Sequence, residues 1–252
     1  MARPSSRLAT APVNGSRFPR KDSLLSAGRR GRSENELGCN ECMLLKAKAA
    51  ASSQLKQPII RSAFELLRSK LPKRIFYHTP EHSEDVLTEA MLFGLEDGLT
   101  ERELLLLAIG AAYHDTGFVE SASENEALGA TLAVKAMVKT DEFGKSEQEL
   151  VHSMILDTAL HKTETGMCQV PTTVLSRYLC DADVSNLGRD DFFERGELYR
   201  RELEMPSLEF MRMTESFLAC HQWHTPAAQR LRQAKRDANL EELRQRIAAH
   251  QG

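Results

Sequence analysis

The chain has 252 residues, 41 % of them hydrophobic and 27 % charged, and 33 Lys and Arg against 36 Asp and Glu give a formal net charge of −3. This composition is typical of a globular protein and excludes a coiled coil, a collagen and a wholly disordered chain. No apolar run approaches the roughly 18 residues that a membrane helix needs, and five cysteines are too few for a disulfide scaffold, so we expect a cytoplasmic protein without a membrane span.

The charge is unevenly distributed along the chain. Residues 1–33 carry eight basic side chains and one acidic one, a net charge of +7, so the remaining 219 residues carry −10. Residues 1–55 are rich in Ser, Arg, Pro and Gly without a sustained apolar period, which predicts a disordered basic extension before a domain at 56–252. Two alternatives are an organelle transit peptide and a tether for nucleic acid or an anionic membrane. Met43 is an alternative start.

A lone C-x-x-C pair, Cys39 and Cys42, lies in this extension. Because no second pair accompanies it, we interpret it as incidental rather than as a zinc or redox motif.

From about residue 57 onward the apolar periods are helical, and no segment has the alternation of a strand. Capping boxes at 100–103 and 146–149 mark two helix starts, and Thr79 followed by Pro80 marks another. The last helix is expected to break near Asn239. These patterns predict an all-α bundle of nine or ten helices, with segments at 60–71, 79–93, 100–112, 124–138, 146–159, 172–180, 190–203, 207–220 and 226–248.

The most informative residues follow the helix predicted at 100–112, whose body is apolar on every side. His114 and Asp115 come directly after it, and Gly117 allows the chain to turn away. An unpaired carboxylate delivered to the core would cost several kcal/mol, so it needs a partner. A divalent cation is a suitable partner because it binds a neutral imidazole and an ionised carboxylate together.

Other His and Asp residues also lie at predicted helix ends. His78 and His82 flank the start of the helix at 79–93, His161 follows the helix at 146–159, and Asp181 and Asp183 follow the helix at 172–180. Since these residues are spread over about 100 positions, they can form one site only by converging in space, as facing helices of a bundle do.

These residues resemble the H…HD…D signature of the HD-domain metal-dependent phosphohydrolases, with His82, His114-Asp115 and Asp183 in that order. The resemblance covers about residues 57–240. A weaker, local likeness to cyclic nucleotide phosphodiesterases comes from Tyr77-His78-x-x-x-His82 and Asp183-Val184-Ser185-Asn186. The flanking matches are Tyr113-His114-Asp115-x-Gly117, Ile155-x-x-Thr158-x-x-His161, Asp181-Ala182-Asp183-Val184-Ser185-Asn186-Leu187-Gly188 and Phe217-Leu218-x-x-His221.

The resemblance implies roles for individual residues. His82, His114, Asp115 and Asp183 match the family's metal ligands, with Asp115 also counted as catalytic, and His78 matches the histidine that protonates the leaving oxygen. The remaining candidates are extra ligands for a second metal or residues that contact the ligands, namely Glu126, His161 and Asp181. Where many members have His before the position of Glu126, this chain has Asn125, which counts against a second metal.

The sequence therefore predicts a hydrolase that uses Mn²⁺, Mg²⁺, Fe²⁺ or Zn²⁺ and acts on a small phosphorylated substrate, a nucleotide or a nucleotide-derived signal. Lys162 and Arg189 are candidates for binding the substrate phosphate. The alternatives are a non-catalytic nucleotide-binding module of the same fold, a nucleic-acid-binding protein that uses the basic extension, and a di-iron oxygenase. The sequence does not specify the oligomeric state.

Overall fold

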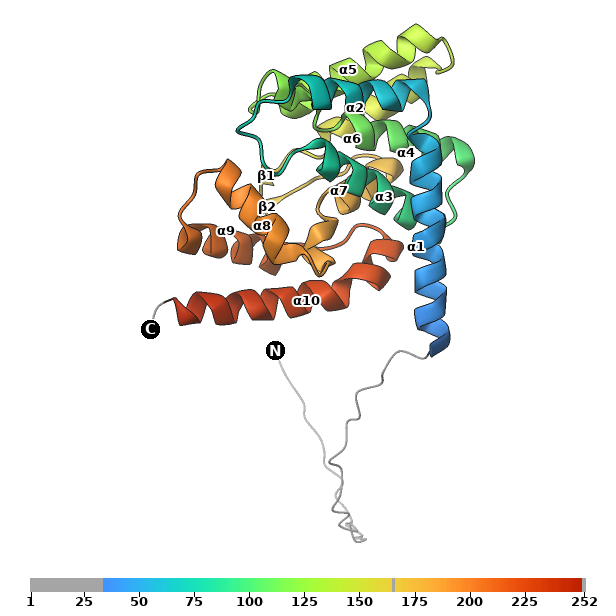
Figure 1. The fold of residues 1–252 in the computed structure, drawn as a ribbon. Coiled ribbons are helices and arrows are strands. Elements are labelled where there is room, and N and C mark those ends of the chain that lie inside the picture. The colour runs from blue at the N-terminus through green and yellow to red at the C-terminus, as the bar shows by residue number, and fades with distance from the viewer. Residues whose placement is uncertain (1–33, 165, 251–252) are drawn as a thin grey trace, which may run out of the picture.

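The computed structural model describes residues 34–164 and 166–250, with side chains from residue 41 onward. In these ranges the chain forms ten α-helices, two short 3-10 helices and one small hairpin (Figure 1). This confirms the predicted all-α fold. The elements are α1 Glu34–Gln54, α2 Pro58–Lys70, α3 Pro80–Glu96, α4 Glu101–Tyr113, η1 Thr116–Val119, α5 Asn125–Thr140, α6 Lys145–Leu156, β1 His161–Lys162, β2 Met167–Cys168, α7 Val174–Asp183, η2 Ser185–Gly188, α8 Phe192–Glu202, α9 Ser207–Cys220 and α10 Pro226–Ala249.

Helix α4 lies at the centre of the main core, as its apolar sequence predicts. It begins with a capping box, in which Thr100 accepts from the backbone N–H of Glu103 and the Glu103 carboxylate accepts from the backbone N–H of Thr100. Every residue from Leu106 to Tyr113 is buried. Helices α2, α3, α5, α6 and α7 all contact α4, so its carboxyl end is enclosed by protein.

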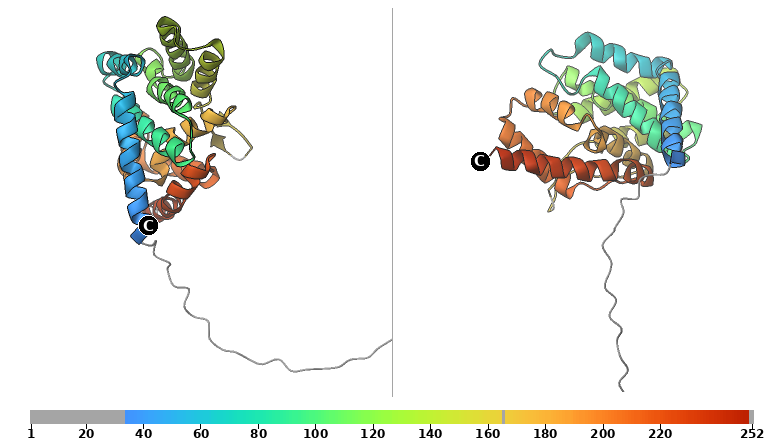
Figure 2. Two further views of the ribbon diagram at one scale, coloured as in Figure 1. Left: turned by 90° about the vertical axis from the view of Figure 1, so that its right-hand side faces the viewer. Right: turned by 60° about the horizontal axis from the view of Figure 1, so that its bottom comes forward.

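The last three helices form a second layer with a smaller core of its own. Figure 2 shows α10 running along the edge of the molecule, and α9 packs against it. A nearly buried ion pair joins this layer to the first one, because the guanidinium of Arg232 on α10 binds both carboxylate oxygens of Glu89 on α3. The residues of the second core are Leu187, Phe192, Leu218, Leu240, Leu243 and Ile247.

Residues 34–54 were predicted to belong to the disordered extension, and this part of the prediction is wrong. They form α1, which packs along α3 with Ala47 and Ala51 buried. The inward face of α1 consists largely of alanines, which form helices well but give a weak apolar period, so the pattern did not stand out. Residues 1–33, which carry the +7 charge, lie outside the described residues.

Several helix boundaries also differ from the prediction, and for three features of the helices the local cause is clear. Helix α3 continues through Gly94, which packs against the side chains of Leu99 and Leu104. Helix α6 begins at Lys145 rather than Ser146, because Gly144 occupies the N-cap and its N–H donates to Glu147. Helix α10 does not break at Asn239, since the side-chain amide of this residue donates outward to the carbonyls of Leu187 and Arg189 without disturbing the helix.

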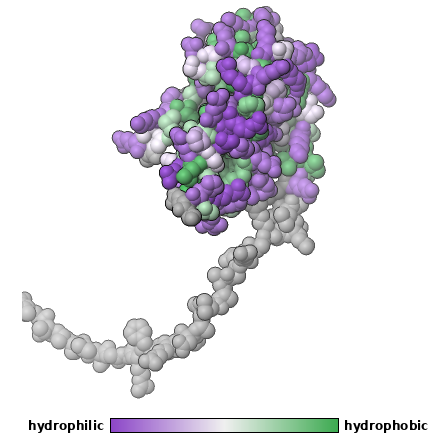
Figure 3. Space-filling model, turned by 60° about the vertical axis from the view of Figure 1, so that its left-hand side comes forward, coloured by the Kyte–Doolittle hydropathy of each residue, from purple (hydrophilic) through white to green (hydrophobic). Residues whose placement is uncertain are grey.

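The described surface agrees with a folded, water-exposed domain. The face seen in Figure 3 is mostly hydrophilic, with hydrophobic residues in small separate groups. Among the described helices, none has an apolar stretch long enough to cross a lipid bilayer. Cys42 is exposed and makes no disulfide, whereas the side chain of Cys39 lies outside the description.

Candidate metal centre

The carboxyl end of α4 delivers His114 and Asp115 into the interior, where they are 1 % and 4 % exposed. Two glycines make this arrangement possible by allowing the start of α5 to lie directly against the end of α4. A Cβ at Gly117 would lie 2.1 Å from the carbonyl oxygen of Asn125, and one at Gly129 would lie 2.6 Å from that of Tyr113. Any larger residue at these two positions would push α5 away from the site.

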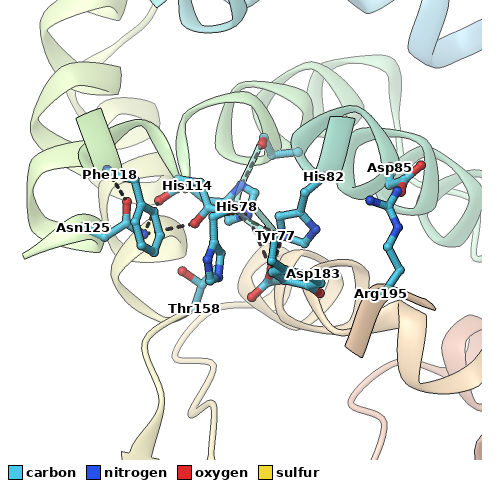
Figure 4. Close-up of polar contacts among 12 residues, drawn as sticks. Tyr77, His78, His82, Asp85, His114, Phe118, Asn125, Thr158, Asp183 and Arg195 are labelled. Carbon is cyan, nitrogen blue, oxygen red and sulfur yellow. Dashed lines mark hydrogen bonds and ion pairs between the residues drawn. The ribbon is translucent and has the colours of Figure 1, made fainter. Parts of the chain in front are cut away.

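Two other helices bring their ends to the same point. His82 lies in the first turn of α3, where Pro80 occupies the first position, and its side chain is buried. Asp183 is the last residue of α7. Figure 4 shows the side chains of His82, His114 and Asp183 turned toward one another. Four residues from three helices therefore converge, as the sequence predicted.

The four donor atoms alternate around a ring. The Asp115 Oδ2 atom lies 3.1 Å from His114 Nε2 and 3.5 Å from His82 Nε2. The Asp183 Oδ1 atom lies 3.2 Å from His82 Nε2 and 3.4 Å from His114 Nε2. Neighbouring ligands about one cation, with bonds of roughly 2.1 Å, are separated by about 3.0 to 3.4 Å. The spacing of His82, His114 and Asp115 therefore suits a single divalent cation, and Asp183 Oδ1 lies next to the two imidazole nitrogens.

The hydrogen bonding of the cluster supports the same interpretation. His114 Nε2 and Asp115 Oδ2 are buried and have no hydrogen-bond partner among the described residues. The other nitrogen of His114, Nδ1, donates to the carbonyl of Ala111 at 2.8 Å, which leaves the Nε2 lone pair directed into the ring. Leaving two buried polar atoms unsatisfied is costly unless another group binds them. His82, His114 and Asp115 are accordingly a group that could hold a metal ion.

The electrostatics of the cluster favour positive charge. Burial alone would lower the pKa of His114, but the carboxylates of Asp115 and Asp183 outweigh it and hold this pKa well above its usual value. Conversely, burial would raise the pKa of Asp115, but the adjacent His114 reverses this effect and the pKa falls to about 2. The pKa of Asp183 is also below its ordinary value, because the adjacent imidazoles of His114 and His82 outweigh burial. Both carboxylates are thus ionised at neutral pH.

His78 lies beside the cluster and is held on all sides. Its ring stacks on Phe118 with centroids 4.3 Å apart, and it contacts His82 edge-on. Its Nδ1–H donates to the carboxylate of Glu202 on α8. The second oxygen of Glu202 accepts the backbone N–H groups of Phe76, Tyr77 and His78 at 2.9, 2.8 and 3.2 Å. One carboxylate therefore fixes both the His78 ring and the loop that carries it.

The structure does not bring the other predicted residues into the ring. Glu126 is half-buried in the first turn of α5, while His161 and Lys162 are exposed on β1. Asp181 is fully buried, but its oxygens accept from the backbone N–H groups of His224 and Thr225 and from the Thr225 hydroxyl, at the start of α10. This carboxylate holds the segment that leads into α10, including its N-cap residue Thr225, although it lies only two residues from Asp183.

Arg189 lies nearer to the ring than Lys162 does. It lines a small pocket next to His82 and Asp183, together with Tyr77, Asp85, Asn186 and Arg195. Within this pocket the guanidinium groups of Arg189 and Arg195 both pair with Asp85 and Asp191. These ion pairs keep two cationic side chains extended beside the ring.

Three residues that contact the site were not predicted in these roles. Glu202 holds His78, and the amides of Asn125 and Gln169 donate to the carboxylates of Asp115 and Asp183. Asn125 could have been found, because it stands next to Glu126 where many members of the family that the sequence resembles have a histidine. Glu202 and Gln169 lie outside any recognisable pattern and could not.

Comparison with known proteins adds no assignment, since neither a family model nor a curated protein sequence matches the chain.

Proposed function

We propose that this protein is a divalent-metal-dependent phosphohydrolase that acts on a phosphoester, a nucleotide or a nucleotide-derived signal. The observation that carries the proposal is the ring of four donor atoms at 3.1 to 3.5 Å, of which His114 Nε2 and Asp115 Oδ2 are buried without hydrogen-bond partners. The resemblance of the same residues to the HD-domain signature supports the choice of phosphoester chemistry.

His82, His114, Asp115 and Asp183 would hold the cation. Two imidazoles and two carboxylates form a nitrogen and oxygen donor set without thiolate, which suits Mn²⁺, Mg²⁺, Fe²⁺ or Zn²⁺. When bound, such a cation polarises a phosphoryl oxygen and lowers the pKa of a coordinated water.

His78 is the residue that we assign as proton donor to the leaving oxygen. Burial would lower its pKa, but the negative charges of Asp115, Glu202 and Asp183 outweigh burial and raise it. In the protonated ring both nitrogens carry hydrogen, and because Nδ1–H is held by Glu202, the Nε2 proton is the one that can be transferred. The stacking on Phe118 keeps the ring in one orientation, which is what a general acid requires.

Arg189 is the better placed of the two candidates for binding substrate phosphate. It lines the pocket next to His82 and Asp183, whereas Lys162 is exposed on β1. Its guanidinium is already oriented by Asp191 and Asp85, so little rotamer freedom is lost when it binds an anion.

The test is a screen of the full chain with Mn²⁺ against cyclic nucleotides, deoxynucleotides, nucleoside monophosphates and guanosine polyphosphates, measuring phosphate or nucleotide release. We expect hydrolysis of at least one class by the wild type and none by Asp115→Ala. Hydrolysis that persists in Asp115→Ala would contradict the assignment of the site. Tight Mn²⁺ binding without turnover of any class would instead favour a non-catalytic binding module.

A further inference from the structure

Each carboxylate of the ring turns its second oxygen toward a buried amide. The Asn125 Nδ2 group donates to Asp115 Oδ1 at 3.0 Å, and the Gln169 Nε2 group donates to Asp183 Oδ2 at 2.7 Å. Both amides are nearly inaccessible, at 2 % and 6 % exposure. Thus Oδ2 of Asp115 and Oδ1 of Asp183 face the ring, and the other oxygen of each carboxylate is occupied.

The main chain fixes both amides in this orientation. Asn125 accepts the backbone N–H of Phe118 at 3.0 Å through its carbonyl, and its Nδ2 also donates to the carbonyl of His114 at 3.1 Å. Gln169 Nε2 donates to the carbonyl of Thr158 at 2.9 Å. A flipped amide would place an oxygen against a carboxylate and a carbonyl, so neither side chain can turn its acceptor to the site.

The common way for a carboxylate to bridge two cations is to offer one oxygen to each, and here one oxygen of each carboxylate is held by an amide. We propose that the site binds one divalent cation and not two, and that Asn125 and Gln169 are positioning residues that reserve a single oxygen of Asp115 and of Asp183 for it. This inference rests on the metal site of the proposed function and specifies its stoichiometry.

The surroundings of the ring agree with one cation. Within the described parts of the chain, His82, His114 and Asp115 form the one group of three or more clustered metal donors that was found. The residues predicted as ligands of a second metal are not part of this group. Glu126 lies in the first turn of α5, His161 is exposed on β1, and Asp181 binds the segment before α10. Asn125 and Gln169 are also neutral, so they orient the carboxylates without cancelling the negative charge that attracts the cation.

The first experiment measures stoichiometry on the full chain. The purified protein, freed of metal, is titrated with Mn²⁺ by calorimetry and examined by electron paramagnetic resonance. We expect one bound ion per chain and the six-line spectrum of an isolated Mn²⁺. Two ions with a spin-coupled spectrum would overturn this inference while leaving the proposed function intact. Absence of Mn²⁺ binding would overturn both.

The second experiment tests the two amides separately. Gln169→Met and Asn125→Ala should each weaken Mn²⁺ binding by about 10- to 100-fold, because residues that orient metal ligands typically contribute this much. Asn239→Ala is the matched control, since it removes an equally buried amide whose bonds go to the carbonyls of Leu187 and Arg189. We expect it to lower thermal stability but to change Mn²⁺ affinity by less than about twofold, as distant sites are independent.

Circular dichroism and thermal melting establish that each variant is folded before its affinity is compared. If Gln169→Met and Asn125→Ala are both folded and both bind Mn²⁺ as tightly as the wild type, the amides have no positioning role. If the Asn239→Ala control weakens binding as much as they do, the loss comes from general destabilisation and the positioning role is likewise rejected.

Discussion

Two regions of the molecule are built from the same residue types but differ in charge. The first region is the ring of His82, His114, Asp115 and Asp183, next to the end of α7. The second, which we call the junction, joins α7 to α9 and α10 and consists of Asp181, His221 and Arg236. In the ring, the pKa of His114 is raised and that of Asp183 is lowered, so the charged forms are favoured. In the junction the pKa of Asp181 is raised and that of His221 is lowered, so the neutral forms are favoured.

The groups that surround each side chain explain why the pKa shifts in the two regions are opposite. Burial raises the pKa of Asp181 to about 6, even though backbone N–H groups of His224 and Thr225 donate to its carboxylate. Burial and the positive charge of Arg236 lower the pKa of His221 to about 3. Carboxylates that face imidazoles keep their charge and leave atoms unpaired, whereas a carboxylate that faces backbone N–H groups is fully satisfied. His221 Nε2 and Arg236 Nε in the junction are also buried without hydrogen-bond partners within the described part of the chain, so unpaired atoms alone do not mark a site. The convergence of imidazole nitrogens and carboxylate oxygens on one point distinguishes the ring from the junction.

The largest expected difference between the two regions is in metal binding. Asp183→Ala removes a donor atom of the ring, so we expect Mn²⁺ affinity to fall by more than about 100-fold, beyond the loss typical of residues that only orient ligands. Asp181→Asn, two residues away, should change this affinity by less than about threefold. Calorimetric titration of both variants checks the contrast, and equal losses would remove the distinction between the two carboxylates.

The next largest effect is a loss of folding stability, which we expect from a substitution in the junction. Asp181→Ala leaves the buried N–H groups of His224 and Thr225 without an acceptor, so we expect a loss of about 2 to 4 kcal/mol in the free energy of unfolding. Urea denaturation measures this loss. Asp183→Ala serves as the comparison, and a larger loss there than in Asp181→Ala would contradict the structural role of the junction.

The third prediction separates Mn²⁺ binding from catalytic turnover and concerns His78, which lies beside the ring. If His78 donates the proton to the leaving group, His78→Ala should lower kcat by about 100-fold or more while one equivalent of Mn²⁺ is retained. Glu202→Gln should have a smaller effect of the same kind and should shift the alkaline limb of the pH–rate profile to lower pH, because Glu202 contributes to the raised pKa of His78 and a general acid is active only while protonated. A loss of Mn²⁺ in His78→Ala would instead make His78 a ligand.

The smallest effect is a pH dependence of stability in the junction. The folded state holds His221 neutral, with a pKa of about 3 against an ordinary value of 6.5, so the unfolded state binds a proton first as the pH falls. The stabilising contribution is complete above pH 6.5 and decreases below it. His221→Phe removes this dependence, so at pH 5.5 the variant should gain about 1 kcal/mol relative to the wild type, compared with pH 7.5. Urea midpoints at the two pH values test this, and an unchanged difference would show that His221 does not titrate in this way.

The two regions also show what the sequence could predict. The apolar body of α4 followed by His114-Asp115 predicted both a core helix and a cluster at its end, because a buried carboxylate must have a partner. His82 and Asp183 were predicted because they lie at helix ends in a recognisable order. Local patterns and burial were sufficient for His114 and Asp115, whereas the choice of His82 and of Asp183 over Asp181 rested on the resemblance to the HD-domain signature.

Other features depend on distant contacts that no local pattern encodes. Asp181 and Asp183 lie two residues apart on one helix, and only the position of the segment before α10 shows that Asp181 binds its backbone N–H groups. Glu202 acts on His78 from 124 residues away, and the alanine face of α1 becomes visible as a buried face only once α3 lies against it. Long-range packing decided these roles.

The origin of the four donors on α3, α4 and α7 has a consequence for folding. His82 and Asp183 are 101 positions apart, so no fragment of the chain can assemble the ring before the bundle itself has formed. A cation bound there would therefore recognise only the native state. Thermodynamic linkage then requires the unfolding free energy to increase with the logarithm of free metal concentration, by about 2.7 kcal/mol at 100 times Kd. The melting temperature would thus report on the supply of metal around the protein.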